Sequence, residues 1–112
     1  MKMLYPLGLA AVVALSLSTG AQAAVDAEAA QALMKKSDCM KCHAVDKDKK
    51  GPSFQKTAAK YKGKPDGEDK IVKVITTSPK VKLDDGTEEE HKAIKSTDAA
   101  AIKNVAQWIL SH

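Results

Sequence analysis

The sequence Cys39-Met40-Lys41-Cys42-His43 decides the fold, because it contains both cysteines of the chain and a histidine directly after them. Two cysteines three positions apart lie close together on one helical turn, and the next residue projects beside them. This spacing matches the two vinyl groups on one edge of a haem ring, and Cys-x-x-Cys-His is typical of c-type haem attachment. The motif predicts thioether bonds from Cys39 and Cys42 and an iron bond from His43.

Three other chemistries use a closely spaced cysteine pair. A disulfide between Cys39 and Cys42 would close almost no loop and would add little stability. A redox-active dithiol normally lies between a strand and a helix, a context that the surrounding sequence lacks. A structural zinc site needs four ligands, and the chain has no second cysteine pair. Covalent haem attachment is the interpretation that uses both thiols and the histidine.

The first part of the chain has the pattern of an export signal. Lys2 is the only charged residue within residues 1–23, and an apolar run covers Leu7–Leu17. The small-residue sequence Ala21-Gln22-Ala23 follows, which resembles a signal-peptidase site. We therefore expect residues 1–23 to be a cleaved signal peptide, and residues 24–112 to form a single domain.

An uncleaved membrane anchor is the alternative, because a spanning helix needs about 20 apolar residues. Gly20, Gln22 and the shortness of the strongly apolar run argue against it. We expect a protein of the periplasm with no stable membrane insertion after cleavage.

The charge pattern indicates protein partners rather than nucleic acid. The formal net charge is +4, every cationic residue is lysine, and aromatic residues make up 4% of the chain. Arginine is the usual bidentate reader of bases, and aromatic side chains stack on single strands, so nucleic-acid binding is not expected. The lysines around Lys41, Lys47, Lys49 and Lys50 are either a solvated surface or a docking face for acidic redox partners.

Several motifs after the cysteine pair extend the pattern. Gly51-Pro52-Ser53-Phe54 follows it, then Ala58–Gly63, and the chain ends in Ala106–Leu110 with Trp108. In this order and spacing the sequence resembles the small bacterial class I cytochromes c. The resemblance implies a cytochrome c fold around one covalent haem c with its iron, and an electron carrier rather than an enzyme. It also implies His43 as proximal ligand, with its Nδ1 proton donated to the carbonyl of Pro52.

Periodicity and capping residues predict an all-α domain of about four helices. The branched residues of the third helix favour a strand by propensity, but its acidic start and the Ser78-Pro79 stop favour a helix. The last helix has an apolar stripe and is capped by Thr97 or Asp98. The expected helices cover 26–38, 53–61, 67–78 and 98–110, with loops at 44–52 and 79–95.

The sixth iron ligand is where the sequence departs from the family pattern. Most such cytochromes supply a methionine from the loop before the last helix, but all four methionines precede His43. His91 lies in the corresponding loop, and we expect it to be the distal ligand, giving bis-histidine iron. The alternatives are a solvated His91, the terminal His112, or a deprotonated lysine, for which the candidates are Lys80, Lys82 and Lys92.

Two further expectations follow from the missing methionine. Imidazole in place of thioether lowers the reduction potential, and nearby carboxylates would lower it further. The main alternative function is a gas-binding or sensing haem protein, since a displaceable sixth ligand would open the iron to small gases. The chain has no arginine, so the sequence does not identify which side chains bind the haem propionates; lysines, Tyr61 and Trp108 are candidates.

Overall fold

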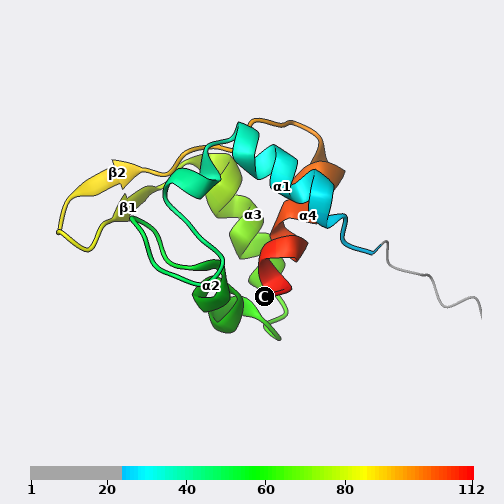
Figure 1. Cartoon of the computed structure of the whole chain (residues 1–112), viewed down its shortest axis with the longest axis horizontal. Coiled ribbons are helices and arrows are strands. Elements are labelled where there is room, and N and C mark those ends of the chain that lie inside the picture. The colour runs from blue at the N-terminus through cyan, green and yellow to red at the C-terminus, as the bar shows by residue number, and fades with distance from the viewer. Residues whose placement is uncertain (1–23) are drawn as a thin grey trace, which may run out of the picture.

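The computed structural model describes residues 24–112. The signal peptide expected at residues 1–23 lies outside them. The described chain is mainly helical, with one small sheet (Figure 1). Its elements are α1 (Ala27–Lys36), the 3₁₀ helix η1 (Cys39–Lys41), α2 (Phe54–Tyr61), α3 (Gly67–Thr77), β1 (Lys80–Lys82), β2 (Glu88–Glu90) and α4 (Ala99–Leu110).

The helices begin where side chains satisfy free backbone amides. Asp26 accepts a hydrogen bond from the amide of Ala29, and Ser53 accepts one from the amide of Lys56. Asp98, one of the two expected caps of α4, accepts bonds from two amides of its first turn. Such caps contribute about 1 kcal/mol each. The prediction of a helix rather than a strand after Gly67 is confirmed, because α3 buries Ile71 on the side facing the core.

The core forms where α4 packs against α1, α2 and α3 (Figure 1). Trp108 is 6% exposed and meets the ring of Phe54 edge-on, with 5.6 Å between the ring centroids. Asn104 of α4 exchanges two hydrogen bonds with the backbone of Asp26, at 2.9 and 2.8 Å, which fixes the start of α1 on the last helix. No helix within residues 24–112 is long and apolar enough to cross a membrane.

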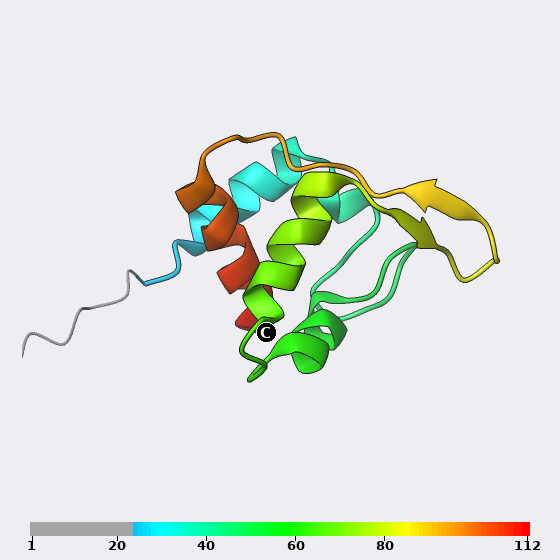
Figure 2. The ribbon, with the colours of Figure 1, turned by 180° about the vertical axis from the view of Figure 1, so that it is seen from behind.

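The segment 79–95, expected as loop, contains an antiparallel hairpin of β1 and β2. Figure 2 shows this hairpin projecting away from the helices. Lys80 faces Glu90 and Lys82 faces Glu88 across the strands, and opposite charges in such positions stabilise a hairpin. The turn closes through Gly86, whose φ of 86° suits glycine. The strands were missed because each has only three residues and β2 is entirely acidic, so the alternation at Val81 does not extend across the hairpin.

Candidate functional site

An apolar cavity lies among the helices, the segment that follows α1 and the base of the hairpin. Each α-helix contributes part of its wall, and β1 contributes Val81. His43 and His91 both line this cavity, although 48 positions separate them in the sequence. The lining residues are Met34, Cys39, His43, Pro52, Phe54, Thr57, Lys60, Tyr61, Ile71, Val74, Ile75, Val81, His91, Lys92, Ile94, Val105 and Ile109.

His43 is held on one side of the cavity by a hydrogen bond from its imidazole and by a stacking contact of its ring. Nδ1 lies 2.7 Å from the carbonyl oxygen of Pro52 and donates a hydrogen bond to it. The ring stacks on Phe54 with 5.3 Å between the centroids. Burial lowers the pKa of His43 below its usual value, and the bond to Pro52 opposes this shift only in part. The neutral ring therefore keeps the lone pair of Nε2 free for a metal.

Gly51 provides the space that the His43 ring occupies. A Cβ built on Gly51 would overlap Cε1 of His43 and lie 2.8 Å from Nδ1 and 2.9 Å from Nε2. Gly51 does not have a positive φ, so this close approach, rather than the backbone angle, is the reason for glycine. The sequence predicted a loop at 44–52, which includes Gly51, but not this contact.

His91 lies opposite His43. The two ring centroids are 6.0 Å apart and the ring planes are inclined by 44°. Nδ1 of His91 donates to the carbonyl of Lys92 at 2.9 Å, and its backbone amide donates to the carbonyl of Pro79 at 2.8 Å. Both histidines thus bond a backbone carbonyl through Nδ1 and keep Nε2 for another partner. The Lys92 carbonyl was not foreseen, because sequence does not show the side chain's direction.

The two cysteines are brought together by η1. The amides of Cys42 and His43 both donate to the carbonyl of Cys39, at 3.2 and 3.0 Å, which forms one tight turn. Both thiols are free and half-buried. Cys39 lines the cavity, whereas Cys42 is not among the lining residues. Burial raises the pKa of the Cys39 thiol.

The other expected candidates divide into those inside and those outside the cavity. Lys92 and Tyr61 line it, together with Thr57 and Lys60, two polar residues that sequence reasoning did not single out. His112 lies elsewhere, with its ring 4.5 Å from that of Trp108, and neither of these two residues lines the cavity. Lys80 and Lys82 are exposed on the hairpin. The polar part of the cavity wall therefore comes partly from α2 and partly from His43, His91 and Lys92.

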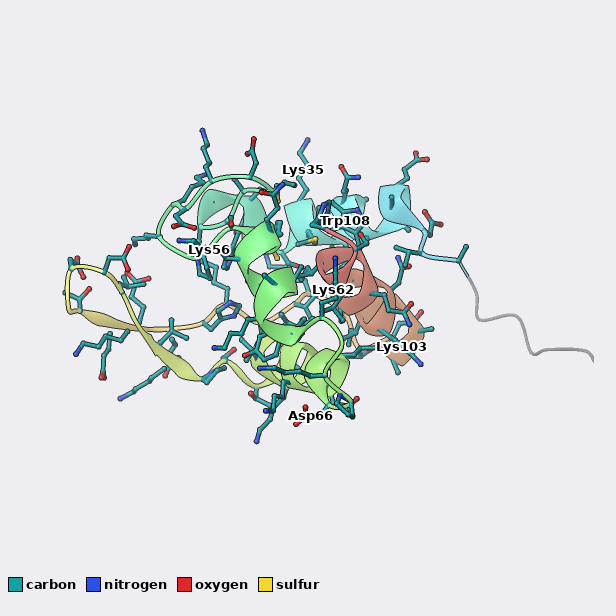
Figure 3. All side chains as sticks on the ribbon, turned by 90° about the horizontal axis from the view of Figure 1, so that it is seen from below. Lys35, Lys56, Lys62, Asp66, Lys103 and Trp108 are labelled. Atoms are coloured by element: carbon teal, nitrogen blue, oxygen red, sulfur yellow. The ribbon has the colours of Figure 1, made fainter. Side chains whose placement is uncertain are left out.

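Several surface lysines, among them Lys56 and Lys62 (labelled in Figure 3), bond to groups of the chain itself. Lys62 donates to the carbonyl of His112 at 2.8 Å, and Lys56 pairs with Asp48. Near the cysteine pair, Lys49 donates to the carbonyl of Met40 at 2.7 Å. The hydrogen bond from Lys50 to Glu89 raises the pKa of that lysine. These contacts fix part of the lysine surface in place.

A helical domain with an apolar cavity, two facing imidazoles and a Cys-x-x-Cys-His turn defines the class of small c-type haem proteins. The family model for cytochrome c matches residues 27–112. The chain belongs to the cytochrome c family.

Solved structures of similar proteins agree with this assignment. The class 1 cytochrome MtoD from Sideroxydans lithotrophicus ES-1 is 50% identical, with a TM-score of 0.76, over 79% of this chain and 97% of that chain. Wild-type cytochrome c552 from Nitrosomonas europaea is 28% identical, with a TM-score of 0.56, over 72% of this chain and 96% of that chain. The N64Del mutant of the latter gives the same values. No curated protein matches the chain.

Family membership confirms several expectations from sequence. The protein is a small monohaem class I cytochrome with the mainly helical fold of that group. Its cofactor is covalently bound haem c with iron, and it is an electron carrier that works with redox partner proteins rather than an enzyme.

Proposed function

We propose that this protein is a periplasmic electron carrier in which His43 and His91 bind the haem iron from opposite sides. The separation of the two rings is the observation that carries this proposal. A metal–imidazole bond is about 2 Å long. Two such bonds, plus the distance from Nε2 to the centre of each ring, add up to a length close to the 6.0 Å that separates the ring centroids. Both Nδ1 atoms donate to carbonyls, which leaves both Nε2 atoms as ligands.

The remaining residues of the site would hold the cofactor. Cys39 and Cys42 would form the thioether bonds, and the carbonyl of Pro52 would keep the His43 ring in orientation. Thr57, Lys60 and Tyr61 supply polar groups on α2 that suit the haem propionates, while the rest of the wall is mostly apolar. Haem c supplies reversible one-electron chemistry, and the chain excludes water and substrates from it.

We infer a lower reduction potential than that of a histidine–methionine relative. Imidazole stabilises ferric iron more than a thioether does. His91 also follows directly after the carboxylates of β2, and Glu88, Glu89 and Glu90 are all exposed. Negative charge near the haem favours the oxidised state, so the imidazole ligand and the neighbouring carboxylates both lower the reduction potential.

The periplasmic location is inferred from the signal-peptide pattern of residues 1–23. Cleavage after Ala23 would produce a mature chain that begins at Ala24, three residues before α1. Mass spectrometry of protein from a periplasmic extract would show this start and the added mass of one haem. Retention of residues 1–23 in the holoprotein would argue for an anchored form.

A carrier and a gas sensor differ in how the reduced protein reacts with carbon monoxide. If His91 fills the sixth position, we expect a six-coordinate low-spin spectrum that does not change when the reduced protein is mixed rapidly with carbon monoxide. A sensor with an open site would form the carbon monoxide complex within the mixing time. That rapid reaction would overturn the proposed carrier function.

We also propose that lysines beside the cysteine pair contact acidic redox partners. Lys41 is exposed, while Lys49 is fixed by its bond to the carbonyl of Met40, so cationic groups border the attachment turn. Raising the salt concentration to about 1 M shortens the Debye length to ~3 Å and should slow electron transfer to an acidic protein. Stopped-flow kinetics with wild type and Lys41→Gln would test this face. A rate independent of salt would contradict it.

A further inference from the structure

Two ion pairs flank His91 in the sequence, and both connect its neighbours to the segment that contains the Cys-x-x-Cys-His motif. On one side, Glu89 Oε1 lies 2.9 Å from Lys50 Nζ. On the other, Lys92 Nζ lies 3.6 Å from Asp38 Oδ2. Asp38 directly precedes Cys39, and Lys50 directly precedes Gly51, so the two partners stand at the two ends of the attachment segment, residues 38–52.

The chain on the C-terminal side of His91 is anchored in the core. Ile94 is 8% exposed, and its amide donates to the carbonyl of Ile75 at 2.8 Å. The amide of Lys95 donates to Oγ of Ser37, a side chain that is 2% exposed. These contacts fix the polypeptide within a few residues of His91.

The hairpin on the N-terminal side is held much less firmly. All three residues of β2 are exposed, and only Val81 of the two strands lines the cavity. A two-stranded hairpin alone is marginally stable in water. At the base of the hairpin, the amide of His91 bonds the carbonyl of Pro79. The Lys50–Glu89 contact is the ion pair that joins the described strands to the rest of the protein.

We propose that Lys50–Glu89 and Asp38–Lys92 form an electrostatic clamp, which holds His91 over the cavity and controls access to the sixth position of the iron. This inference rests on the proposed ligation by His91. The two pairs have opposite polarity, so the acidic member lies on the hairpin in one and on the attachment segment in the other. Displacing residues 89–92 as a unit would break both attractions at once. Glu89 and Lys50 are positioning residues, which act on the iron only through His91.

The size of the effect follows from the exposure of the pairs. The side chains of Lys50 and Glu89 are 57% and 49% exposed, and those of Lys92 and Asp38 are 59% and 32% exposed. Exposed ion pairs of this kind shift an equilibrium by about two- to fivefold each. Salt screens them, since the Debye length falls from ~30 Å at 0.01 M to ~3 Å at 1 M. The clamp therefore makes release of His91 sensitive to ionic strength.

The test uses slow binding of carbon monoxide to the reduced holoprotein, followed over seconds to minutes. Carbon monoxide is uncharged, so salt acts on the protein rather than on the probe. We expect the rate for wild type to increase severalfold between about 0.01 M and 1 M salt. Glu89→Gln should bind carbon monoxide about two- to fivefold faster at low salt and respond less to added salt.

Glu88→Gln is the matched control, because it removes the same charge from the same strand. Glu88 faces Lys82 across the hairpin and forms no ion pair with residues 38–52 in the part of the chain that the structure describes. Its rate should stay close to that of wild type. The charge exchange Lys50→Glu with Glu89→Lys restores the attraction and should return the rate toward the wild-type value.

Two outcomes separate the clamp from the proposed function. Equal rates for Glu89→Gln and Glu88→Gln, or a wild-type rate that salt does not change, would overturn the clamp while the low-spin spectrum upholds ligation by His91. A five-coordinate wild-type spectrum with immediate carbon monoxide binding would overturn ligation by His91 and, with it, the clamp.

Discussion

Replacing His91 with methionine is expected to raise the reduction potential. The variant would place a thioether where we propose an imidazole, and methionine opposite histidine stabilises ferrous iron. We expect a rise of roughly 0.1 V or more, a modest share of the ~0.8 V over which axial ligands set haem potentials. The ferric variant should also gain the weak far-red absorption band that marks methionine ligation of haem iron. Potentiometric titration and absorption spectra measure both effects.

His112→Met provides the matched control for this substitution. His112 packs against Trp108 and does not line the cavity, so its replacement by the same residue should leave potential and spectrum unchanged. If His91→Met had the potential of wild type, or if wild type already showed the far-red band of methionine ligation, His91 would not be the distal ligand.

Gly51→Ala is expected to displace the His43 ring. The added Cβ would overlap three ring atoms of His43, and the ring cannot retreat freely because it stacks on Phe54 and bonds Pro52. Overpacking of this kind costs about 1–3 kcal/mol, and the lost alignment of Nε2 should weaken the low-spin spectrum. Thermal unfolding of the holoprotein and the ferric spectrum report the two effects.

Pro52→Ala distinguishes this effect from a general weakness of the loop. The variant keeps the backbone carbonyl that accepts from His43 Nδ1, so the spectrum should remain low-spin even if the melting temperature falls. A Gly51→Ala protein with the spectrum and stability of wild type would show that the His43 ring lies elsewhere in the holoprotein.

The helices could be predicted because their signals are local. Asp26, Ser53 and Asp98 are capping residues directly before helical patterns, and each accepts a bond from its own first turn. Met34 of the first helix is 1% exposed, on the face that packs into the core. The hairpin has no comparable signal, because Lys80 comes to lie opposite Glu90, and Lys82 opposite Glu88, only once the chain folds back.

The site was predictable only where one side chain carries the chemistry. The Cys-x-x-Cys-His motif predicts the roles of Cys39, Cys42 and His43, and the absence of a late methionine indicates His91 as the distal ligand. Two other features could not be predicted: the bond from His91 to the Lys92 carbonyl and the close approach of the His43 ring to Gly51. Both depend on the direction of the backbone, which the sequence does not show. The Lys50–Glu89 pair joins residues 39 positions apart and depends on how the hairpin folds back.

Iron K-edge X-ray absorption on the ferric wild-type holoprotein tests the central claim most directly. If His43 and His91 both bind the iron, the nearest shell contains only nitrogen, at about 2 Å, and the spectrum shows imidazole scattering from two rings. A sulfur neighbour in the first shell, or an iron with its sixth position vacant, would contradict the proposed bis-histidine carrier.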